Sequence, residues 1–361
     1  METVDVVVIG AGVAGLSAAA ALAVDVSVIV VEMEAAPAHH ATGRSAALYI
    51  PTYGPPNVRR LTAASAPFFH SDDDGRAPTP LVSARSVMYV ADEAHHDHLT
   101  QVANGMGEAG GQLELIDANA ARTRCPALRD DWVVAGGIDH DALDIDVAAT
   151  VAAFRATLVE AGGQIRTDHR VTALDRTANG WTITTTAGSL SAGAIVNASG
   201  AWVDQVAELA GLAPLGFVPK RRTMGVGPIA DDTDPGDHFV AHAAMDFYFG
   251  VEPAGIMFSP ADETPSEPVD ARPEEIDLAI AIDRINEATT LGLRSVRQSW
   301  AGLRTFSADG DLVIGPDPAE PTFVWCGGQG ATGSTRRPPR RWRPPHSRWA
   351  TNCRRHSSTS A

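Results

Sequence analysis

The first 31 residues show a pattern of apolar and polar positions that predicts three elements. Two runs rich in valine and isoleucine, residues 4–9 and 26–31, flank an alanine-rich stretch over residues 13–23. Such runs are typical of strands buried on both faces of a parallel sheet, and the stretch between them is typical of a helix. Three glycines and Asp25 interrupt the segment and no basic residue precedes it, so we expect neither stable membrane insertion nor a signal peptide.

The rest of the chain mixes strand and helix patterns. We expect mostly loops until about Pro80, a strand over residues 81–90, and a helix over residues 93–110. Residues 145–161 have the spacing of an amphipathic helix, and Asn179–Gly180 predicts the turn of a hairpin. The remaining predicted elements are a strand, turn and helix over residues 193–211, strands over residues 218–226, 247–251, 255–259 and 322–326, and a helix from about Pro273.

A glycine fingerprint, GAGVAG, follows the first predicted strand directly. Gly10 permits the tight turn, Gly12 lets the backbone approach a pyrophosphate, and Gly15 allows the helix to lie close to the sheet. Glu32 follows Gly10 by 22 residues, at the end of the second strand, where a carboxylate can accept hydrogen bonds from ribose hydroxyls. Strand, helix, strand and terminal acid together favour a dinucleotide site over a plain glycine turn. The fingerprint alone leaves both NAD and FAD open.

Later motifs narrow this choice. In place of a third strand of the same kind, the chain continues into a polar loop, HHATGRSAALYIP. It is followed in order by VNASGAWVD, PKRRTM, FYF, SWAGLRTFSADGDLVIG and GGQGATG. With the GAGVAG start, these motifs resemble the glycine/D-amino-acid oxidase family of FAD-dependent flavoproteins, in particular its D-arginine dehydrogenase-type members. The resemblance covers residues 1–333.

The resemblance and the element pattern together predict a discontinuous two-domain α/β protein. Residues 1–80, 141–215 and 305–333 would form a Rossmann-like FAD-binding domain with a parallel sheet. Residues 81–140 and 216–304 would form an inserted, β-rich α+β substrate-binding domain. We expect residues 334–361 to form a disordered basic tail outside both domains.

The resemblance implies non-covalently bound FAD that lies extended along the first domain. Its pyrophosphate would lie at residues 10–15, its ribose at Glu32, and its adenine at the backbone of Val171. The loop at residues 42–47 would hold the phosphates and the flavin edge, and the turn at residues 328–333 would face the isoalloxazine ring. The expected cofactor-binding residues are Gly10, Gly12, Ala14, Gly15, Glu32, Met33, Thr42, Gly43, Arg44, Ser45, Ala46, Ala47, Val171, Gly200, Gly328, Gly330, Ala331, Thr332 and Gly333.

Two arginines and two tyrosines are the candidate catalytic residues. Arg304 lies in an otherwise apolar stretch, WAGLRTF, and a guanidinium in such surroundings suits a carboxylate partner. Arg222 lies in a basic cluster, where a surface charge is an equal alternative on the sequence alone. The resemblance assigns both arginines to the substrate carboxylate, and it places Tyr53 and Tyr248 over the substrate. Core packing is the alternative for each tyrosine.

The implied reaction is oxidation of a D-amino acid with a neutral amine. The Cα hydrogen would leave as a hydride to flavin N5, and the imino acid would hydrolyse to a 2-keto acid and ammonia. Leu48 and Val87 lie where the arginine-type relatives have a histidine and a glutamate, so we expect neutral, apolar substrates. A sarcosine- or glycine-type oxidase and an inactive flavin-binding or truncated product are alternatives. Oxygen, a quinone or another carrier would reoxidise the flavin.

Charge is distributed unevenly between the predicted domains and the tail. The chain has a formal net charge of −16, yet residues 334–361 contain eight arginines and no acidic residue. Removing these eight from the 28 basic residues leaves 20 against 44 acidic ones. So acidic a body argues against binding to nucleic acid. The tail contains four prolines between positions 338 and 345, which exclude a regular helix, whereas the resemblance implies a helix that supports the flavin. An out-of-frame coding region, a natural basic tail and an arm that binds phosphate or nucleic acid all remain open.

Cysteines and histidines add little chemistry. Three widely spaced cysteines suggest a reducing compartment, so we expect a cytoplasmic protein without a disulfide framework. Cys326 lies beside the predicted flavin turn, and we expect a buried thiol there in place of a covalent flavin link. In DEAHHDHL, His95 and His98 could share a helix face as metal ligands, but a solvated helix surface is the expected role. We therefore predict no metal site.

Overall fold

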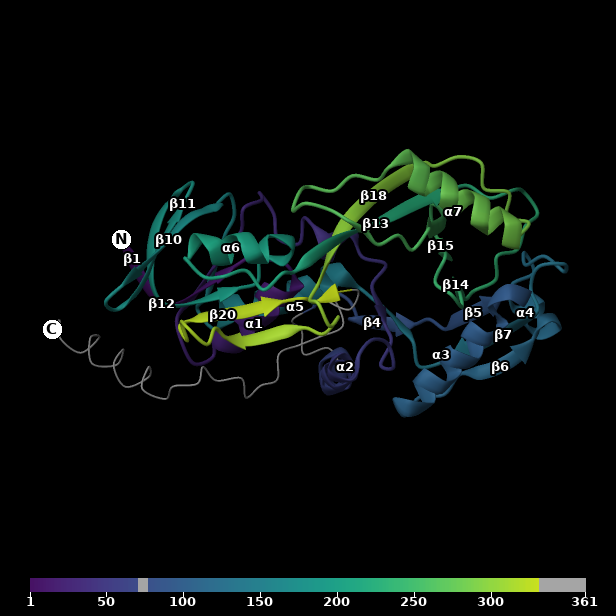
Figure 1. The fold of residues 1–361 in the computed structure, drawn as a ribbon, viewed down its shortest axis with the longest axis horizontal. Coiled ribbons are helices and arrows are strands. Elements are labelled where there is room, and N and C mark those ends of the chain that lie inside the picture. The colour runs from purple at the N-terminus through teal and green to yellow at the C-terminus, as the bar shows by residue number, and fades with distance from the viewer. Residues whose placement is uncertain (71–76, 331–361) are drawn as a thin grey trace.

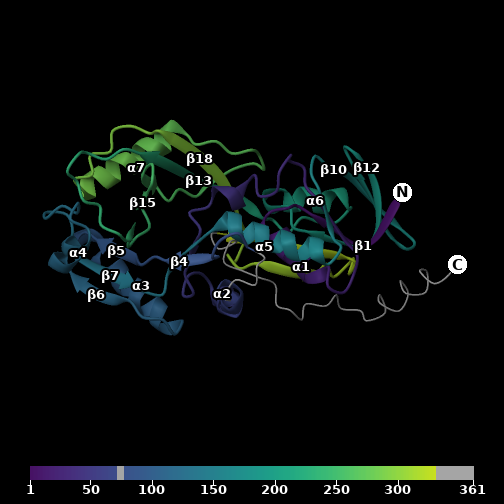
Figure 2. The same ribbon diagram turned by 180° about the vertical axis from the view of Figure 1, so that it is seen from behind.

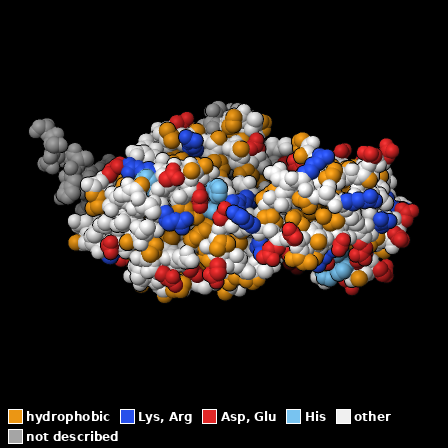
Figure 3. Space-filling model, turned by 90° about the horizontal axis from the view of Figure 1, so that it is seen from above, with side chains coloured by type: hydrophobic (Ala, Val, Ile, Leu, Met, Phe, Trp, Pro, Cys, Tyr) orange, Lys and Arg blue, Asp and Glu red, His pale blue; other side chains and the backbone are white. Residues whose placement is uncertain are grey.

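The computed structural model describes residues 1–70 and 77–330, whose strands form three sheets. Two large sheets lie side by side along the long axis of the molecule (Figure 1). From above, the described chain shows two lobes, over which acidic side chains and small groups of basic ones are interspersed (Figure 3). The predicted tail and the expected cofactor residues Ala331, Thr332 and Gly333 lie outside the described residues.

The first large sheet contains the predicted strand–helix–strand start. Parallel pairing joins β20, β12, β1, β2 and β9, and β12 also pairs antiparallel with β11 of a hairpin. The strands are β1 (Glu2–Ile9), β2 (Val28–Val31), β9 (Gln164–Arg166), β10 (Val171–Thr177), β11 (Gly180–Thr185), β12 (Gly188–Asn197), β19 (Val313–Pro316) and β20 (Phe323–Gly327). The predicted hairpin around Gly180 is confirmed, with φ +143° at this glycine.

Helices cover both faces of this sheet, as expected for a buried parallel sheet. Alternate residues of β1 point to opposite sides: Val6 and Val8 pack with helices α1 (Val13–Leu22) and α5 (Val147–Glu160). Val7 and Ile9 pack on the other side with α6 (Val203–Leu209), which follows the short helix η3 (Gly200–Trp202). Helices α1 and α5 lie in front of the sheet in Figure 2, and α6 lies in front of it in Figure 1.

The second large sheet is mostly antiparallel and has the order β17-β13-β16-β15-β14-β5-β7-β6, with β18 also paired to β13. Its strands are β5 (Val87–Ala91), β6 (Glu114–Asp117), β7 (Ala135–Asp139), β13 (Val218–Gly227), β14 (Phe239–His242), β15 (Tyr248–Glu252), β16 (Gly255–Ser259), β17 (Thr264–Pro265) and β18 (Gln298–Phe306). One face packs with α4 (Ala118–Arg124) and α7 (Glu275–Ala288), and the other with α3 (His96–Glu108), which follows η2 (Glu93–His95).

A small third sheet of β3 (Leu48–Tyr49), β8 (Leu143–Ile145) and β4 (Val82–Ala84) lies between the two large ones. It corrects one prediction, because residues 81–90 do not form a single strand. β4 pairs with β8, whereas β5 pairs with β7 and β14 in the second large sheet. The chain changes sheet at Arg85, whose guanidinium donates to Asp144 at 3.0 Å and to the carbonyl of Val251 at 3.3 Å.

A second prediction, of mostly loops up to about Pro80, misses a helix. Helix α2 spans Pro56–Phe69 and buries Val58, Thr62, Ser65 and Phe69. The hydroxyl groups of the two polar members donate to backbone carbonyls one turn earlier, which satisfies them inside the protein. Because two of the four inward positions are polar, the apolar period of this helix is hidden in the sequence.

Within the described ranges, no helix is both long and apolar enough to cross a membrane.

Candidate functional site

The turn between β1 and α1 leaves no room for side-chain atoms. A Cβ atom added to Gly10 would lie 2.5 Å from the carbonyl oxygen of Ala198, and the φ of Gly10 is +103°. A Cβ atom at Gly15 would lie 1.9 Å from the carbonyl oxygen of Gly10. Leu16 donates the first i→i−4 hydrogen bond of α1, to Gly12. The N–H groups of Gly12, Ala14 and Gly15 have no acceptor among the described residues, so they are available to a ligand. This arrangement fits the pyrophosphate of a dinucleotide.

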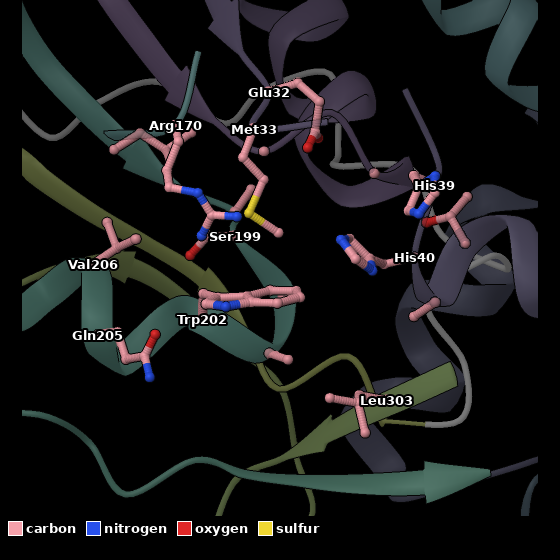
Figure 4. A pocket seen from close by; sticks show the side chains of 18 of the residues that line it. Glu32, Met33, His39, His40, Arg170, Ser199, Trp202, Gln205, Val206 and Leu303 are labelled. Atoms are coloured by element: carbon pink, nitrogen blue, oxygen red, sulfur yellow. The ribbon is translucent and has the colours of Figure 1, made fainter. Parts of the chain in front are cut away.

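Glu32 follows the last residue of β2, as the fingerprint predicts. Its Oε2 accepts a 2.7 Å hydrogen bond from the N–H of Ala11, and its Oε1 accepts one of 3.0 Å from Glu34. Each oxygen keeps a further lone pair for a ribose hydroxyl. Glu32 lines a cavity, here called the Glu32 cavity, into which Trp202 and Arg170 also point (Figure 4).

Three neighbouring cavities form one crevice that runs between the two large sheets. The Glu32 cavity shares Thr42 and Gly200 with a second cavity beside Gly328, here called the Gly328 cavity. The Gly328 cavity in turn shares Arg222 and Arg304 with a third cavity, here called the arginine pocket. An extended dinucleotide fits this succession, with its adenosine end at Glu32 and its other end next to the two arginines.

The predicted cofactor residues are distributed along this crevice. Those that line the Glu32 cavity are Gly10, Gly12, Glu32, Met33, Thr42, Arg44, Val171 and Gly200. Those that line the Gly328 cavity are Gly12, Ala14, Thr42, Arg44, Ser45, Gly200, Gly328 and Gly330. Those that line the arginine pocket are Ser45, Ala46 and Ala47. Gly15 and Gly43 line none of these three cavities.

The loop around Thr42 connects the glycine turn to the second large sheet. The Thr42 hydroxyl accepts a 3.1 Å hydrogen bond from the N–H of Val13 at the start of α1. The Arg44 guanidinium donates to the carbonyls of Ala271 and Ala301 at 3.0 and 2.9 Å, and to Asp270 at 2.6 Å. Most of the donors of Arg44 are therefore used within the protein, so we assign this side chain a bracing role between the sheets.

The arginine pocket brings together all six residues predicted for the substrate. Its described lining contains Tyr53, Arg222, Tyr248 and Arg304, together with the apolar Leu48 and Val87. These residues come from a loop, from β13, β15 and β18, and from β3 and β5. No Asp or Glu is among the described residues that line the pocket. The described lining therefore has no formal negative charge, and its positive charge lies on two guanidinium groups among mostly apolar side chains.

The two arginines differ in their partners. Arg222 donates from Nε to the carbonyl of Asp262 at 2.8 Å, and its NH2 lies 3.3 Å from the Glu263 carboxylate. Arg304 forms no ion pair with any described residue within 4.0 Å, and burial lowers its pKa. The neighbouring Arg222 adds to this lowering. An anion that entered the pocket would supply the partner that Arg304 lacks.

Two buried tyrosines of the pocket have pKa values shifted in opposite directions. Burial alone would raise the pKa of Tyr248, but the positive charges of Arg304 and Arg222 outweigh it and lower the pKa. The hydroxyl of Tyr248 donates to the Met224 sulfur at 3.1 Å. Burial raises the pKa of Tyr89, and the charge of Asp139 raises it further. The positive charge is thus concentrated at the arginine end of the pocket.

Asp139 is a buried acid that the sequence did not indicate. It pairs with Val87 across β7 and β5, and it is only 1% exposed. Its Oδ1 accepts a 2.9 Å hydrogen bond from the N–H of Asp141, while Oδ2 has no hydrogen-bond partner among the described residues. Burial is the main cause that raises its pKa. Asp139 does not itself line the arginine pocket.

Several other lining residues also escaped prediction. Tyr89, Phe239 and Ala241 line the arginine pocket because they alternate with core residues along β5 and β14, and Met245 lies in the turn after β14. The alternation after Val87 would have indicated Tyr89. At the other end of the crevice, the rings of His40 and Trp202 lie 4.7 Å apart beside the Glu32 cavity.

Cys326 is buried as expected, and burial raises the pKa of its thiol to about 12. A thiol with so high a pKa is rarely ionised at neutral pH and is a poor nucleophile.

Comparisons with known proteins agree with this geometry. L-alpha-glycerophosphate oxidase from Mycoplasma pneumoniae was solved with FAD bound. It superposes on this chain with a TM-score of 0.81 at 19% sequence identity, over 93% of this chain and 92% of that one. Glycine oxidase from Geobacillus kaustophilus gives a TM-score of 0.77 at 19% sequence identity, over 93% of this chain and 91% of that one. L-amino acid deaminase from Proteus vulgaris gives 0.75 at 16% identity, over 93% and 91%.

These similarities establish a shared fold. The sequence model of the family described as FAD dependent oxidoreductase, DAO, matches residues 5–336. The glycine turn, Glu32 and the continuous crevice provide the space and the donors that FAD requires. The chain belongs to the DAO family of FAD-dependent oxidoreductases, and its cofactor is FAD.

Proposed function

We propose that the chain oxidises D-amino acids with neutral, apolar side chains to imino acids, which hydrolyse in water to 2-keto acids and ammonia. The observation that carries the proposal is the arginine pocket. Two guanidinium groups, one of them without an ion-pair partner among the described residues, border an apolar cavity next to the cofactor crevice. An α-amino acid offers a carboxylate for the arginines and a side chain for the apolar walls.

Bound FAD supplies the oxidant, since flavin N5 can accept the Cα hydrogen as a hydride. The protein residues have two tasks. Arg304 and Arg222 hold the carboxylate, which fixes the position of Cα. Their positive charges also lower the pKa of a nearby substrate ammonium, which favours the neutral amine. The nitrogen lone pair then forms the C=N bond as the hydride leaves.

The apolar preference rests on Leu48 and Val87. Both line the pocket, and a basic substrate side chain would meet no acid on the described lining. Desolvating a guanidinium without a partner is costly. Asp139 lies on the neighbouring strand and does not line the pocket. The D configuration is supported by the resemblance of the sequence motifs to D-arginine dehydrogenase-type proteins.

The test is the visible absorption spectrum of the purified chain, recorded before and after anaerobic addition of D-leucine. We expect a flavin spectrum that bleaches with D-leucine and responds at least tenfold more slowly to D-arginine. Comparable rates for both would refute the apolar preference. Bleaching by L-leucine or sarcosine alone would replace the D-amino acid with another substrate class.

A colourless protein would point to the C-terminal segment. In that case residues 334–361 are replaced by an alanine-rich helical segment and the spectrum is recorded again. Recovery of flavin would show that residues 334–361 weaken cofactor binding. Continued absence of flavin would contradict the assignment of the crevice.

A further inference from the structure

A cluster of histidine and aspartate side chains lies where two neighbouring strands of the second large sheet end. β5 and β14 run parallel, with His242 opposite Val90 in the register. Asp92 follows the end of β5 directly, and His242 is the last residue of β14. Because the carboxyl ends of parallel strands meet at the same edge, these side chains are brought together. His242 alternates with Ala241, which lines the arginine pocket, so the cluster is distinct from that pocket.

Three of these side chains can offer donor atoms to one point in space. One donor atom from each of Asp92, His95 and His242 lies within 4.8 Å of the other two. The rings of His95 and His242 have centroids 4.7 Å apart and are nearly perpendicular, at 83°. A carboxylate oxygen of Asp246 lies 3.4 Å from Nδ1 of His242. The cluster therefore combines two imidazoles with two carboxylates.

His242 provides an independent reason to expect a ligand. It is 2% exposed, and neither of its ring nitrogens has a hydrogen-bond partner among the described residues. The contact with Asp246 is close enough for an ion pair but lacks hydrogen-bond geometry. Buried polar atoms are almost always satisfied, so an imidazole with two unsatisfied nitrogens requires an explanation. A bound metal ion would satisfy one of them.

The environment of His242 favours a fixed orientation of its ring. The ring stacks on Phe247 with 5.3 Å between centroids and an angle of 3°. The ring centroid of Trp132 lies 5.6 Å from that of His242. Asp92 orients the second imidazole, because its Oδ1 lies 2.7 Å from Nδ1 of His95 and also accepts a 2.9 Å hydrogen bond from the backbone N–H of His95. A carboxylate bonded to one nitrogen of a histidine leaves the other nitrogen for a metal.

We propose that Asp92, His95 and His242 bind a zinc ion. Imidazole nitrogens and carboxylate oxygens are common zinc ligands, and a water molecule can complete the tetrahedral geometry that zinc prefers. The carboxylate of Asp246, beside Nδ1 of His242, adds a second negative charge close to the divalent cation. The site connects η2 to the turn after β14, and that turn carries Met245 into the arginine pocket. Zinc would thus brace one wall of the pocket without touching the substrate.

A second cluster, Glu34, His39 and His40, carries no comparable inference. His40 is only half-buried, and its Nε2 already lies 2.9 Å from the Glu34 carboxylate, within hydrogen-bond distance. His39 and His40 also line the Glu32 cavity, so the cluster belongs to the cofactor crevice.

The test measures zinc binding to the full chain with flavin bound, after removal of any affinity tag and treatment with a chelator. Zn²⁺ is added alone, and bound metal is measured by equilibrium dialysis with elemental analysis. The first variant is His242→Phe, which keeps a buried ring next to Phe247. The second is His95→Ala, at a residue that is half-exposed. The matched control is His98→Ala, whose ring lies 5.4 Å from that of His95 but outside the triad.

We expect the unmodified chain and His98→Ala to bind one more zinc ion than the other two variants. The affinity of the site should fall at least tenfold in His95→Ala and in His242→Phe. Zinc should also raise the thermal unfolding midpoint of the unmodified chain and of His98→Ala only. Residues of the tail, such as Cys353 and His356, would contribute equally to all four proteins. Equal zinc binding in all four, or none in any, would overturn the proposal. Flavin content shows whether each variant is folded.

Discussion

The cofactor crevice and the arginine pocket border one another, but they are built from different parts of the chain. At the cofactor end, the backbone of one short turn is central to the site, and backbone atoms leave no room for a Cβ atom at Gly10 or Gly15. In the pocket, the side chains of Tyr53, Arg222, Tyr248 and Arg304 converge from segments that are far apart in sequence. The glycine turn depends on residues that have no Cβ atom, whereas the arginine pocket depends on the side chains of these four residues.

This difference determines how each site can change. A Cβ added at Gly10 or Gly15 would disrupt the turn, because the nearest neighbours are themselves backbone atoms that cannot easily move aside. A side-chain pocket can exchange one residue for another of similar volume while the sheet beneath it stays intact. We therefore expect cofactor binding to be intolerant of small changes, and substrate recognition to be lost without loss of the fold.

The largest effect is expected for Gly15→Ala. The added Cβ would lie 1.9 Å from the carbonyl oxygen of Gly10, so α1 must move away from the turn. Overpacking of this kind costs about 1–3 kcal/mol, and we expect the affinity for FAD to fall on the order of 100-fold. The measurement is the ratio of flavin to protein absorbance after gel filtration.

The matched control is Gly107→Ala. Gly107 lies in α3, and a Cβ there would meet nothing within 4 Å. Because alanine favours a helix over glycine, this variant should keep its flavin and gain up to about 1 kcal/mol in stability. A Gly15→Ala protein with the same flavin content as Gly107→Ala would show that the turn can relax.

Arg304→Met should have an effect of the same order, but on the substrate alone. Removing one partner of a buried charge pair costs about 2–5 kcal/mol, so kcat/KM for D-leucine should fall roughly 100-fold or more, mainly through KM. Flavin content should not change. Thermal stability should stay the same or rise, because a buried guanidinium without an ion-pair partner is replaced by an apolar side chain.

Arg297→Met serves as the control, since Arg297 is exposed and donates to the carbonyl of Ala254 at 3.2 Å. It removes the same charge just before β18, so kcat/KM should stay within about twofold. Equal losses in both variants would mean that Arg304 acts through the general field of the protein. Steady-state kinetics with D-leucine and thermal unfolding of both proteins check these expectations.

The same contrast explains what could be predicted from the sequence. The glycine turn and Glu32 lie within 23 residues of each other, and their spacing follows from the length of one strand, helix and strand. Arg304 was indicated by its apolar neighbours. Met245 gave no such signal, because it reaches the pocket only through the turn between β14 and β15, and Phe239 only through the pairing of β14 with β5. Which strands become neighbours is decided by tertiary packing.

Where polar residues occupy buried positions, the local pattern misleads for a physical reason. Thr62 and Ser65 lie on the buried face of α2, where their hydroxyls donate to backbone carbonyls. The buried face of this helix is therefore not a continuous apolar stripe. Arg85 similarly marks the point where one apparent strand divides between two sheets, through contacts with segments that lie more than 50 residues away.

Two of the buried acids, Glu32 and Asp139, extend the comparison to stability. Glu32 has a backbone N–H donor for each carboxylate oxygen, whereas Asp139 has a partner among the described residues for Oδ1 only. In Glu32→Gln, a side-chain NH2 group replaces one of the two carboxylate oxygens and would face the backbone N–H donor of Ala11 or Glu34. The substitution should therefore destabilise the protein by about 1–2 kcal/mol. Asp139→Asn removes a buried charge that is half satisfied, and at neutral pH it should stabilise on the order of 1 kcal/mol. The two substitutions are thus expected to have opposite signs.

The pH dependence separates the Asp139 effect from a change in packing. Because burial raises the pKa of Asp139 in the native protein, the unfolded chain releases this proton first as the pH increases. The unfolding free energy therefore declines from about pH 4, the ordinary value for aspartate, until the pH passes the raised native pKa. Asp139→Asn lacks this decline, so its advantage over the unmodified chain should be absent in acid and grow toward neutral pH. Thermal unfolding midpoints of both proteins across this range provide the measurement. An advantage that stayed constant with pH would assign the effect to packing, and a disadvantage at neutral pH would mean that the Asp139 carboxylate is satisfied by a partner such as a buried water.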